Sequence, residues 1–256
     1  MDDLSFDHLI VAHEKDFETL PMCVEGLEHV GGKTGKVFVV SNKNPDIGGV
    51  EFIDERTFDK HFSISAIKEA FPDCSKNAGW LYQQIVKMLC WKEIDFSNGR
   101  YHSVDADVVY LNEVDYGGSA FTHSRPYSNG ANGDIYYHTY NDTTKKLIGR
   151  TYEKSYICHN MVFDMAYLQK LTKLVEDRNG MSFFESVCNS CSVMEEHPLF
   201  SEFDLYGNWM CDNHPSECKE IDVKWVDIVV IPDDHVKSVL KKEGLQFVAA
   251  HAYFRE

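Results

Sequence analysis

Short apolar runs alternate with amphipathic segments along the first half of the chain. The runs at residues 6–12, 36–40 and 50–53 predict buried strands, and apolar residues at helical spacing predict a helix over residues 17–30. Strands that alternate with helices are typical of a parallel sheet that carries helices on its faces. We therefore expect an α/β fold.

Residues 77–89 form the most strongly patterned helix in the sequence. Trp80, Gln84 and Lys87 share one face, and Gln83 lies at its border. The apolar stripe of the same helix comprises Leu81, Ile85, Met88 and Leu89. Because the helix ends just before another predicted strand, its polar face is expected at a crevice. The alternative is an ordinary amphipathic helix with solvated Gln and Lys side chains.

The segment at residues 101–111 combines an apolar strand pattern with two acids, Asp105 and Asp107. Aspartate is rare inside strands, because the carboxylate loses water and β-propensity is poor. A short turn at the carboxyl end of a strand would place both carboxylates where open α/β sheets bind ligands. Two adjacent carboxylates favour a hard divalent ion such as Mg²⁺ or Mn²⁺, which often also binds phosphates. The pair therefore indicates a metal–diphosphate site, and a surface turn with two solvated acids is the alternative.

The middle of the chain is poor in apolar patterning. Residues 116–134 are rich in Gly, Ser and Asn and predict a long loop, of the kind that often covers a site. After it, residues 135–140 suggest a strand and residues 141–146 a turn.

A further strand is predicted to begin at residue 156 and to run into a helix over residues 165–175. We expect His159 and Asn160 at that strand-to-helix junction, where polar side chains can contact a substrate. A hydrogen-bonded capping histidine is an equally good interpretation of His159.

Acids among large aromatic residues mark the segment at residues 200–209. Ser201 can cap a helix whose first turn carries Glu202 and Asp204. Alternatively, apolar walls would raise the pKa of one carboxyl group towards that of a general base. The remaining predicted elements are helices at residues 181–193 and 235–243 and strands at residues 223–231 and 246–254, the last carrying His251.

The charge balance restricts the class of partner. The chain has 256 residues, 41 Asp and Glu against 25 Lys and Arg, and a net charge of −16. That excess argues against nucleic acid or an anionic membrane, so an anionic ligand would need a metal ion. No apolar run is long enough for a transmembrane helix, and the amino terminus is unlike a signal peptide. We therefore expect a cytoplasmic protein with reduced cysteines.

Taken in order, these segments resemble the small single-domain glycosyltransferases of the GT-A type, bacterial or virus-encoded. The resemblance spans about residues 6–251, and its motifs are GWLYQQIVK, DAD, HNMVFD and SEFDLYGNW. It implies a Rossmann-like GT-A fold with a central, mostly parallel mixed sheet flanked by helices. It also implies one domain over residues 1–256, with a nucleotide-binding half at 1–115 and an acceptor-binding half at 116–256.

The implied activity is that of a metal-dependent hexosyl- or pentosyltransferase. It would move a sugar from a nucleotide-sugar, most often a UDP-sugar, to a hydroxyl of a glycan or glycoconjugate. Asp105, Asp107 and His251 would hold Mn²⁺ or Mg²⁺, and Glu202 or Asp204 would act as base if the reaction inverts the anomeric centre. The implied donor contacts are Ala12, His13, Asp16, Gly79, Trp80, Gln83, Lys87 and Asp105.

Three other interpretations stay open. Cys188-x-x-Cys191, followed by Cys211 and Cys218, could bind zinc, although the second pair is wider than a zinc knuckle. A non-catalytic module that binds sugar nucleotides could share the same fold. A metal-dependent phosphohydrolase would need a larger cluster of His and Asp ligands than the sequence reveals.

Overall fold

The computed structural model describes most of the chain. The described residues are 6–31, 34–116, 120–122, 125–126, 134–152 and 154–251.

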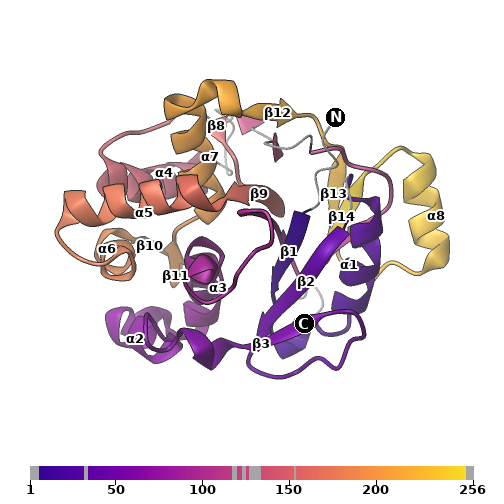
Figure 1. The fold of residues 1–256 in the computed structure, drawn as a ribbon, viewed down its shortest axis with the longest axis horizontal. Coiled ribbons are helices and arrows are strands. Elements are labelled where there is room, and N and C mark those ends of the chain that lie inside the picture. Colours follow the sequence, from indigo (N-terminus) through magenta and orange to yellow (C-terminus); the bar gives the residue numbers. More distant parts are fainter. Residues whose placement is uncertain are drawn as a thin grey trace.

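A five-stranded sheet with the order β3-β2-β1-β4-β9 forms the centre of the fold (Figure 1). Its strands are β1 (Phe6–Val11), β2 (Thr34–Ser41), β3 (Glu51–Asp54), β4 (Arg100–Asp105) and β9 (Asn160–Asp164). The first four are parallel, and β9 runs antiparallel to β4. The expected mixed, mostly parallel sheet is confirmed.

Alternating residues of the central strands face two different layers of helices. Leu9 and Val11 pack into the cluster beneath α3 (Ala78–Leu89), whereas Ile10 and Ala12 pack with α1 (Leu20–Gly26). Figure 1 shows α1 and α8 on one side of the sheet and α2–α7 on the other. The other helices on these two faces are α2 (Ile64–Ala70), α5 (Met165–Asn179), α6 (Phe183–Ser190), α7 (Glu202–Asn213) and α8 (Asp234–Lys242).

A smaller sheet with the order β13-β14-β5 continues from the end of β4. Its strands are β5 (Val108–Tyr110), β13 (Trp225–Ile228) and β14 (Phe247–Ala250). Strand β14 is antiparallel to β5 and parallel to β13. The two-stranded pairs are β10 (Ser192–Met194) with β11 (His197–Leu199), β12 (Lys219–Ile221) with β6 (Ala120–Thr122), and β7 (Arg125–Pro126) with β8 (Lys154–Ser155).

The strand expected at residues 135–140 and the turn at 141–146 are wrong, because α4 (Asp134–Ile148) covers both. The Tyr, Ile and Thr content favours strands locally. The segment is nevertheless a helix, because burial outweighs this local preference. The side chains buried at helical spacing against the other helices of this layer are Thr143, Thr144, Leu147 and Ile148. Part of the loop expected at residues 116–134 lies outside the described residues.

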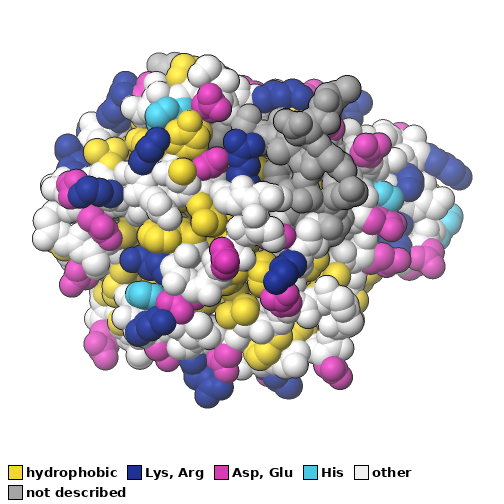
Figure 2. All heavy atoms as spheres, in the orientation of Figure 1, with side chains coloured by type: hydrophobic (Ala, Val, Ile, Leu, Met, Phe, Trp, Pro, Cys, Tyr) yellow, Lys and Arg dark blue, Asp and Glu magenta, His cyan; other side chains and the backbone are white. Residues whose placement is uncertain are grey.

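The surface carries both signs of charge. On the face shown in Figure 2, Lys and Arg side chains lie scattered among acidic ones rather than gathered into a basic patch. Among the described residues, no helix combines the length and apolar character that crossing a membrane requires.

Candidate active site

The aspartate pair lies at the carboxyl end of a central strand. Strand β4 ends at Asp105, and Ala106 and Asp107 form a turn before β5 begins. All three residues line a cavity of about 370 Å³. The turn predicted from the sequence is therefore confirmed, and it relieves the conflict between two acids and a buried strand.

The antiparallel pairing of β9 with β4 places His159 at the same edge of the sheet as Asp105. Val104 of β4 pairs with Asn160 of β9, and the Asp105 N–H donates to the His159 carbonyl at 2.8 Å. The His159 Nδ1 atom then lies 3.2 Å from Asp105 Oδ2. The expected strand-to-helix junction is wrong, because β9 begins at Asn160 and meets α5 at the opposite end of the sheet. His159 precedes the strand, so its proximity to Asp105 depends on strand direction.

Strands β13 and β14 bring two more ligand-type residues to the cavity. Asp227 pairs with Ala249, and His251 follows two residues later on the same face of the strand. His251 Nδ1 lies 2.7 Å from Asp107 Oδ2, and its Nε2 lies 2.9 Å from Asp227 Oδ1. Asp227 was not among the predicted site residues, although an acid within the apolar run VKWVDIVVI is the same signal as Asp105 in its strand.

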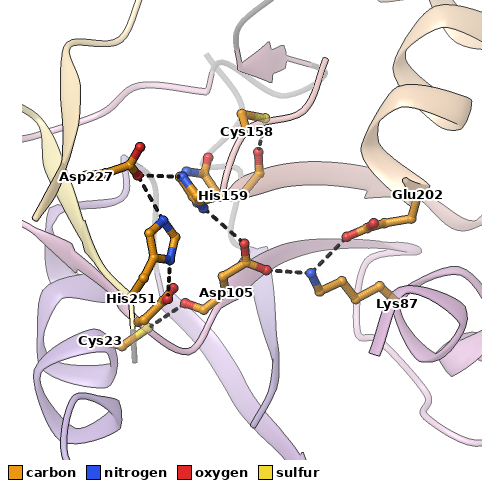
Figure 3. Close-up of polar contacts among 10 residues, drawn as sticks. Cys23, Lys87, Asp105, Cys158, His159, Glu202, Asp227 and His251 are labelled. Carbon is orange, nitrogen blue, oxygen red and sulfur yellow. Dashed lines mark hydrogen bonds and ion pairs between the residues drawn. The ribbon is translucent and has the colours of Figure 1, made fainter. Parts of the chain in front are cut away.

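The buried Lys87 contacts the Asp105 carboxylate on the side away from His159 (Figure 3). Lys87 Nζ donates to Asp105 Oδ1 at 2.5 Å and to Glu202 Oε1 at 2.8 Å. Its side chain is 2% exposed, that of Glu202 is fully buried, and the Lys87 ammonium also lies over the Phe203 ring. An isolated buried charge would be costly, so the three groups stabilise one another as an ionic chain.

These contacts set the ionisation of the site. Burial raises the pKa of Glu202, although Lys87 opposes the shift. Burial would also raise the pKa of Asp105, but the positive charges of Lys87 and His159 lower it to about 2. Burial lowers the pKa of His159, but hydrogen bonds to two carboxylates raise it to about 9. Asp105 is therefore a carboxylate at neutral pH.

The predicted donor contacts fall into two adjoining cavities. Trp80 and Gln83 line both, and Asp16 lines the first. Ala12, His13 and Gly79 line the second, which is also about 370 Å³. Lys87 lies beneath the first cavity rather than on its wall. The aromatic walls of the first cavity are Trp80, Tyr140, Phe203 and Trp225.

Three predicted residues lie behind the cavity wall. Glu202 is held by Lys87, and Asp204 accepts a hydrogen bond from the Tyr156 backbone N–H at 2.6 Å. Ser201 caps α7 by accepting from the Asp204 N–H, as the sequence predicted. Asn160 is fully buried and accepts from the Tyr116 hydroxyl at 2.6 Å. These partners give Glu202, Asp204 and Asn160 structural contacts rather than a position on the cavity surface.

The aspartate pair has the donor chemistry that a divalent ion needs. Asp107 Oδ1 is buried and accepts no hydrogen bond within the described part of the chain, although its other oxygen meets His251. Burying a carboxylate oxygen without a hydrogen-bond donor costs folding free energy, unless a bound cation interacts with that oxygen. Asp105, Asp107 and His159 also bring ligand atoms within 4.8 Å of one another. The residues present therefore fit Mn²⁺ or Mg²⁺.

The cysteines do not form a comparable cluster. Cys188 and Cys191 lie at the end of α6, whereas Cys211 lies in α7 and accepts a hydrogen bond from the Tyr156 hydroxyl. Within the described ranges, the groups of three or more possible metal ligands contain no cysteine. The zinc site considered from the sequence has no geometric support there.

Comparison with known structures identifies the architecture. The crystal structure of mouse xyloside xylosyltransferase 1, in its apo form, is similar to this chain with a TM-score of 0.51 and 12% sequence identity. The alignment covers 99% of this chain and 100% of that one. The chain has the GT-A fold of glycosyltransferases. At this identity the likeness shows the fold alone. No protein-family model and no curated protein sequence matches the chain.

Proposed function

We propose that the protein is a metal-dependent glycosyltransferase that moves a sugar from a nucleotide-sugar, most often a UDP-sugar, to a glycan hydroxyl. The observation that carries this proposal is the pair Asp105 and Asp107, placed by a GT-A sheet at its carboxyl edge inside a cavity. The partners would be the nucleotide-sugar donor and a glycan or glycoconjugate acceptor.

The second cavity suits the nucleotide. Although the chain has a net charge of −16, this cavity is lined by Lys15, Lys68 and Lys76 against a single acid, Glu55. His13 and Trp80 add flat rings beside which a base can lie. The two cavities adjoin at Trp80 and Gln83, so a donor that spans both would place its diphosphate near the aspartate pair.

Asp105, Asp107 and His251 would hold Mn²⁺ or Mg²⁺ beside that diphosphate. A bound divalent ion supplies positive charge that stabilises the leaving diphosphate. Lys87 fixes the Asp105 carboxylate through a 2.5 Å contact and keeps it ionised. His159 orients the other Asp105 oxygen. Aromatic walls exclude water from the sugar, which limits hydrolysis of the donor.

The proposal leaves Glu202 and Asp204 out of the proton transfer. Both are engaged behind the wall, by Lys87 and by the Tyr156 backbone. A base for the acceptor would have to reach the cavity, and Asp227 is the carboxylate there that is most exposed, at 47% of its side chain.

A panel of nucleotide-sugars tests this function. Calorimetry with Mn²⁺ present should show binding of at least one donor, and its turnover should fall at least about 100-fold in Asp107→Ala because the leaving charge loses its counter-ion. Asp234→Ala, an exposed acid on α8, serves as the matched control and should retain turnover. Failure of every donor to bind would contradict the proposal.

A phosphohydrolase is the second candidate, favoured by one observation. The structure gathers more ligand-type residues than the sequence suggested, namely Asp105, Asp107, His159, Asp227 and His251. This cluster supplies the His and Asp ligands that a metal-dependent phosphohydrolase needs. Transfer to a sugar acceptor separates the two, because a phosphohydrolase cleaves the donor at the same rate with and without the acceptor.

A further inference from the structure

We propose that Cys211 and Cys218 form a redox-active pair, which a small disulfide such as oxidised glutathione converts to an intramolecular disulfide bond. Both side chains are partly exposed, and both are free thiols in this structure. The inference goes beyond the proposed function, since neither cysteine lines the two cavities of the candidate active site.

The two thiols meet where helix α7 ends. Cys211 lies in the last turn of α7, and Cys218 directly follows the short 3₁₀ helix at Pro215–Glu217. A hydrogen bond joins the two side chains, and Cys218 Sγ also lies 3.4 Å from the His214 carbonyl oxygen. Sulfur atoms that share a hydrogen bond are neighbours, which is the first requirement of a disulfide.

Packing holds the turn that carries Cys218. The His214 ring contacts the rings of Tyr167 and Trp209 at centroid distances of 4.5 Å and 5.2 Å. The His214 N–H also donates to the Met210 carbonyl at 2.7 Å. Because Cys218 Sγ contacts the carbonyl of this fixed residue, it is held against the end of α7.

Cys211 is the nucleophile of the pair. The hydrogen bond from Cys218 lowers the pKa of Cys211, burial opposes the shift, and the Tyr156 hydroxyl, 3.2 Å from Cys211 Sγ, lowers the pKa further. The same hydrogen bond between the thiols raises the pKa of Cys218. Cys211 therefore carries the thiolate, which is the form that attacks disulfides, and Cys218 keeps its proton until the second step.

Cys188 and Cys191 have the C-x-x-C spacing but lack this activation. Burial raises the pKa of Cys188 to about 12 and also raises that of Cys191. Both lie at the carboxyl end of α6, where the helix dipole disfavours an anion. Cys211 also lies in the last turn of a helix, but there two donors face its sulfur atom. Spacing alone would select the first pair, whereas the structure selects Cys211 and Cys218.

The exchange with oxidised glutathione is balanced in two steps. The Cys211 thiolate attacks one sulfur of oxidised glutathione, which forms a mixed disulfide and releases a first glutathione thiolate that takes up the proton Cys211 has lost. Cys218 then loses its proton and attacks the Cys211 sulfur, so that the second glutathione leaves and takes up this proton. The two cysteines lose two electrons, and one oxidised glutathione gains them as two thiols.

The disulfide would join two segments that lead to the cavity. Helix α7 carries Phe203 of the cavity wall in its first turn. The chain after Cys218 runs through β12 to Trp225 and Asp227, which also line the cavity. The bond would therefore restrain two parts of the cavity wall without entering the cavity.

Oxidation of the full-length protein in mixtures of reduced and oxidised glutathione tests the proposal, with mass spectrometry of its peptides as the measurement. Cys211 and Cys218 should become linked in the wild type, and dithiothreitol should restore both thiols. Cys218→Ser lacks the second thiol and should accumulate glutathione on Cys211. In Cys211→Ser, modification of Cys218 should be at least about 10-fold slower than that of Cys211 in Cys218→Ser. Cys188→Ser is the matched control and should form the wild-type link.

Alkylation of the reduced protein by iodoacetamide at pH 7 measures the activation separately. Cys211 should react at least about 10-fold faster than Cys188, because it holds more thiolate. Equal rates would overturn its assignment as the nucleophile. The pair itself is overturned if both thiols stay free in oxidised glutathione, or if Cys188 and Cys191 become linked in their place. None of these measurements involves a sugar donor, so they are independent of the turnover that tests the proposed function.

Discussion

At the scale of single residues, Lys87 is the cation that pairs with the carboxylates of Asp105 and Glu202 beneath the cavity. Lys87→Met should destabilise the protein by about 3–5 kcal/mol, because Glu202 and Asp105 lose the cation that their buried charges require. Urea unfolding at pH 7 measures the change. Lys92→Met, at an exposed position, should stay within about 0.5 kcal/mol of the wild type.

A second substitution separates charge from packing. Adding Glu202→Gln to Lys87→Met removes the fully buried carboxylate, so the double variant should be more stable than Lys87→Met alone. A Lys87→Met variant as stable as Lys92→Met would show that the ionic chain is not a stabilising feature.

At the scale of elements, the packing of α7 on the loop before β9 constrains the site. A Cβ atom on Gly207 would lie 2.6 Å from Cγ of Tyr156, three residues before His159. Gly207→Ala should therefore destabilise the protein by about 1–3 kcal/mol through overpacking. Helix propensity alone predicts the opposite effect, an increase of about 1 kcal/mol in the free energy of unfolding. Gly79→Ala in α3 meets open space and is the matched control in thermal unfolding. Equal melting temperatures for the two variants would contradict the prediction.

The elements also show how far the sequence can predict this molecule. Strands β1 to β4, helix α3 and the turn at Asp105 follow from local patterns, because apolar period and turn position are encoded within a few residues. The position of His159 depends on the antiparallel direction of β9, and that of Asp227 on its pairing with β14. Helix α4 forms despite strand-like composition, since burial of Leu147 and Ile148 outweighs propensity. An acid in a predicted strand can be recognised locally, as at Asp227, but the strand pairing that brings it to the cavity cannot be read from the neighbouring residues.

At the scale of the whole molecule, the central sheet joins the two halves proposed from the sequence. Strand β9 comes from residues 116–256 and lies beside β4 of residues 1–115. Strand β14 pairs with β5 in the same way. The division into a nucleotide-binding and an acceptor-binding half stays a prediction, but His159, Asp227 and His251 of the second half reach the cavity through these shared sheets.

Two neutral histidines inside that sheet should make the whole fold sensitive to acid. His8 of β1 and His102 of β4 are paired in register, with their Nδ1 atoms 3.1 Å apart. Burial lowers the pKa of His8 to about 4 and that of His102 well below its ordinary value. Between pH 6.5 and 4 the unfolded chain therefore binds protons that the folded chain does not, and stability falls as the pH falls. At pH 5 this amounts to about 2 kcal/mol for His8.

Urea unfolding at pH 7 and pH 5 measures this dependence. His8→Gln should lose about 2 kcal/mol less than the wild type between the two pH values, whatever its stability at pH 7. His235→Gln, at an exposed position on α8, should lose as much as the wild type. If His8→Gln showed the wild-type loss, acid sensitivity would have to come from other groups, since the free-energy difference follows directly from the proton that buried His8 cannot bind.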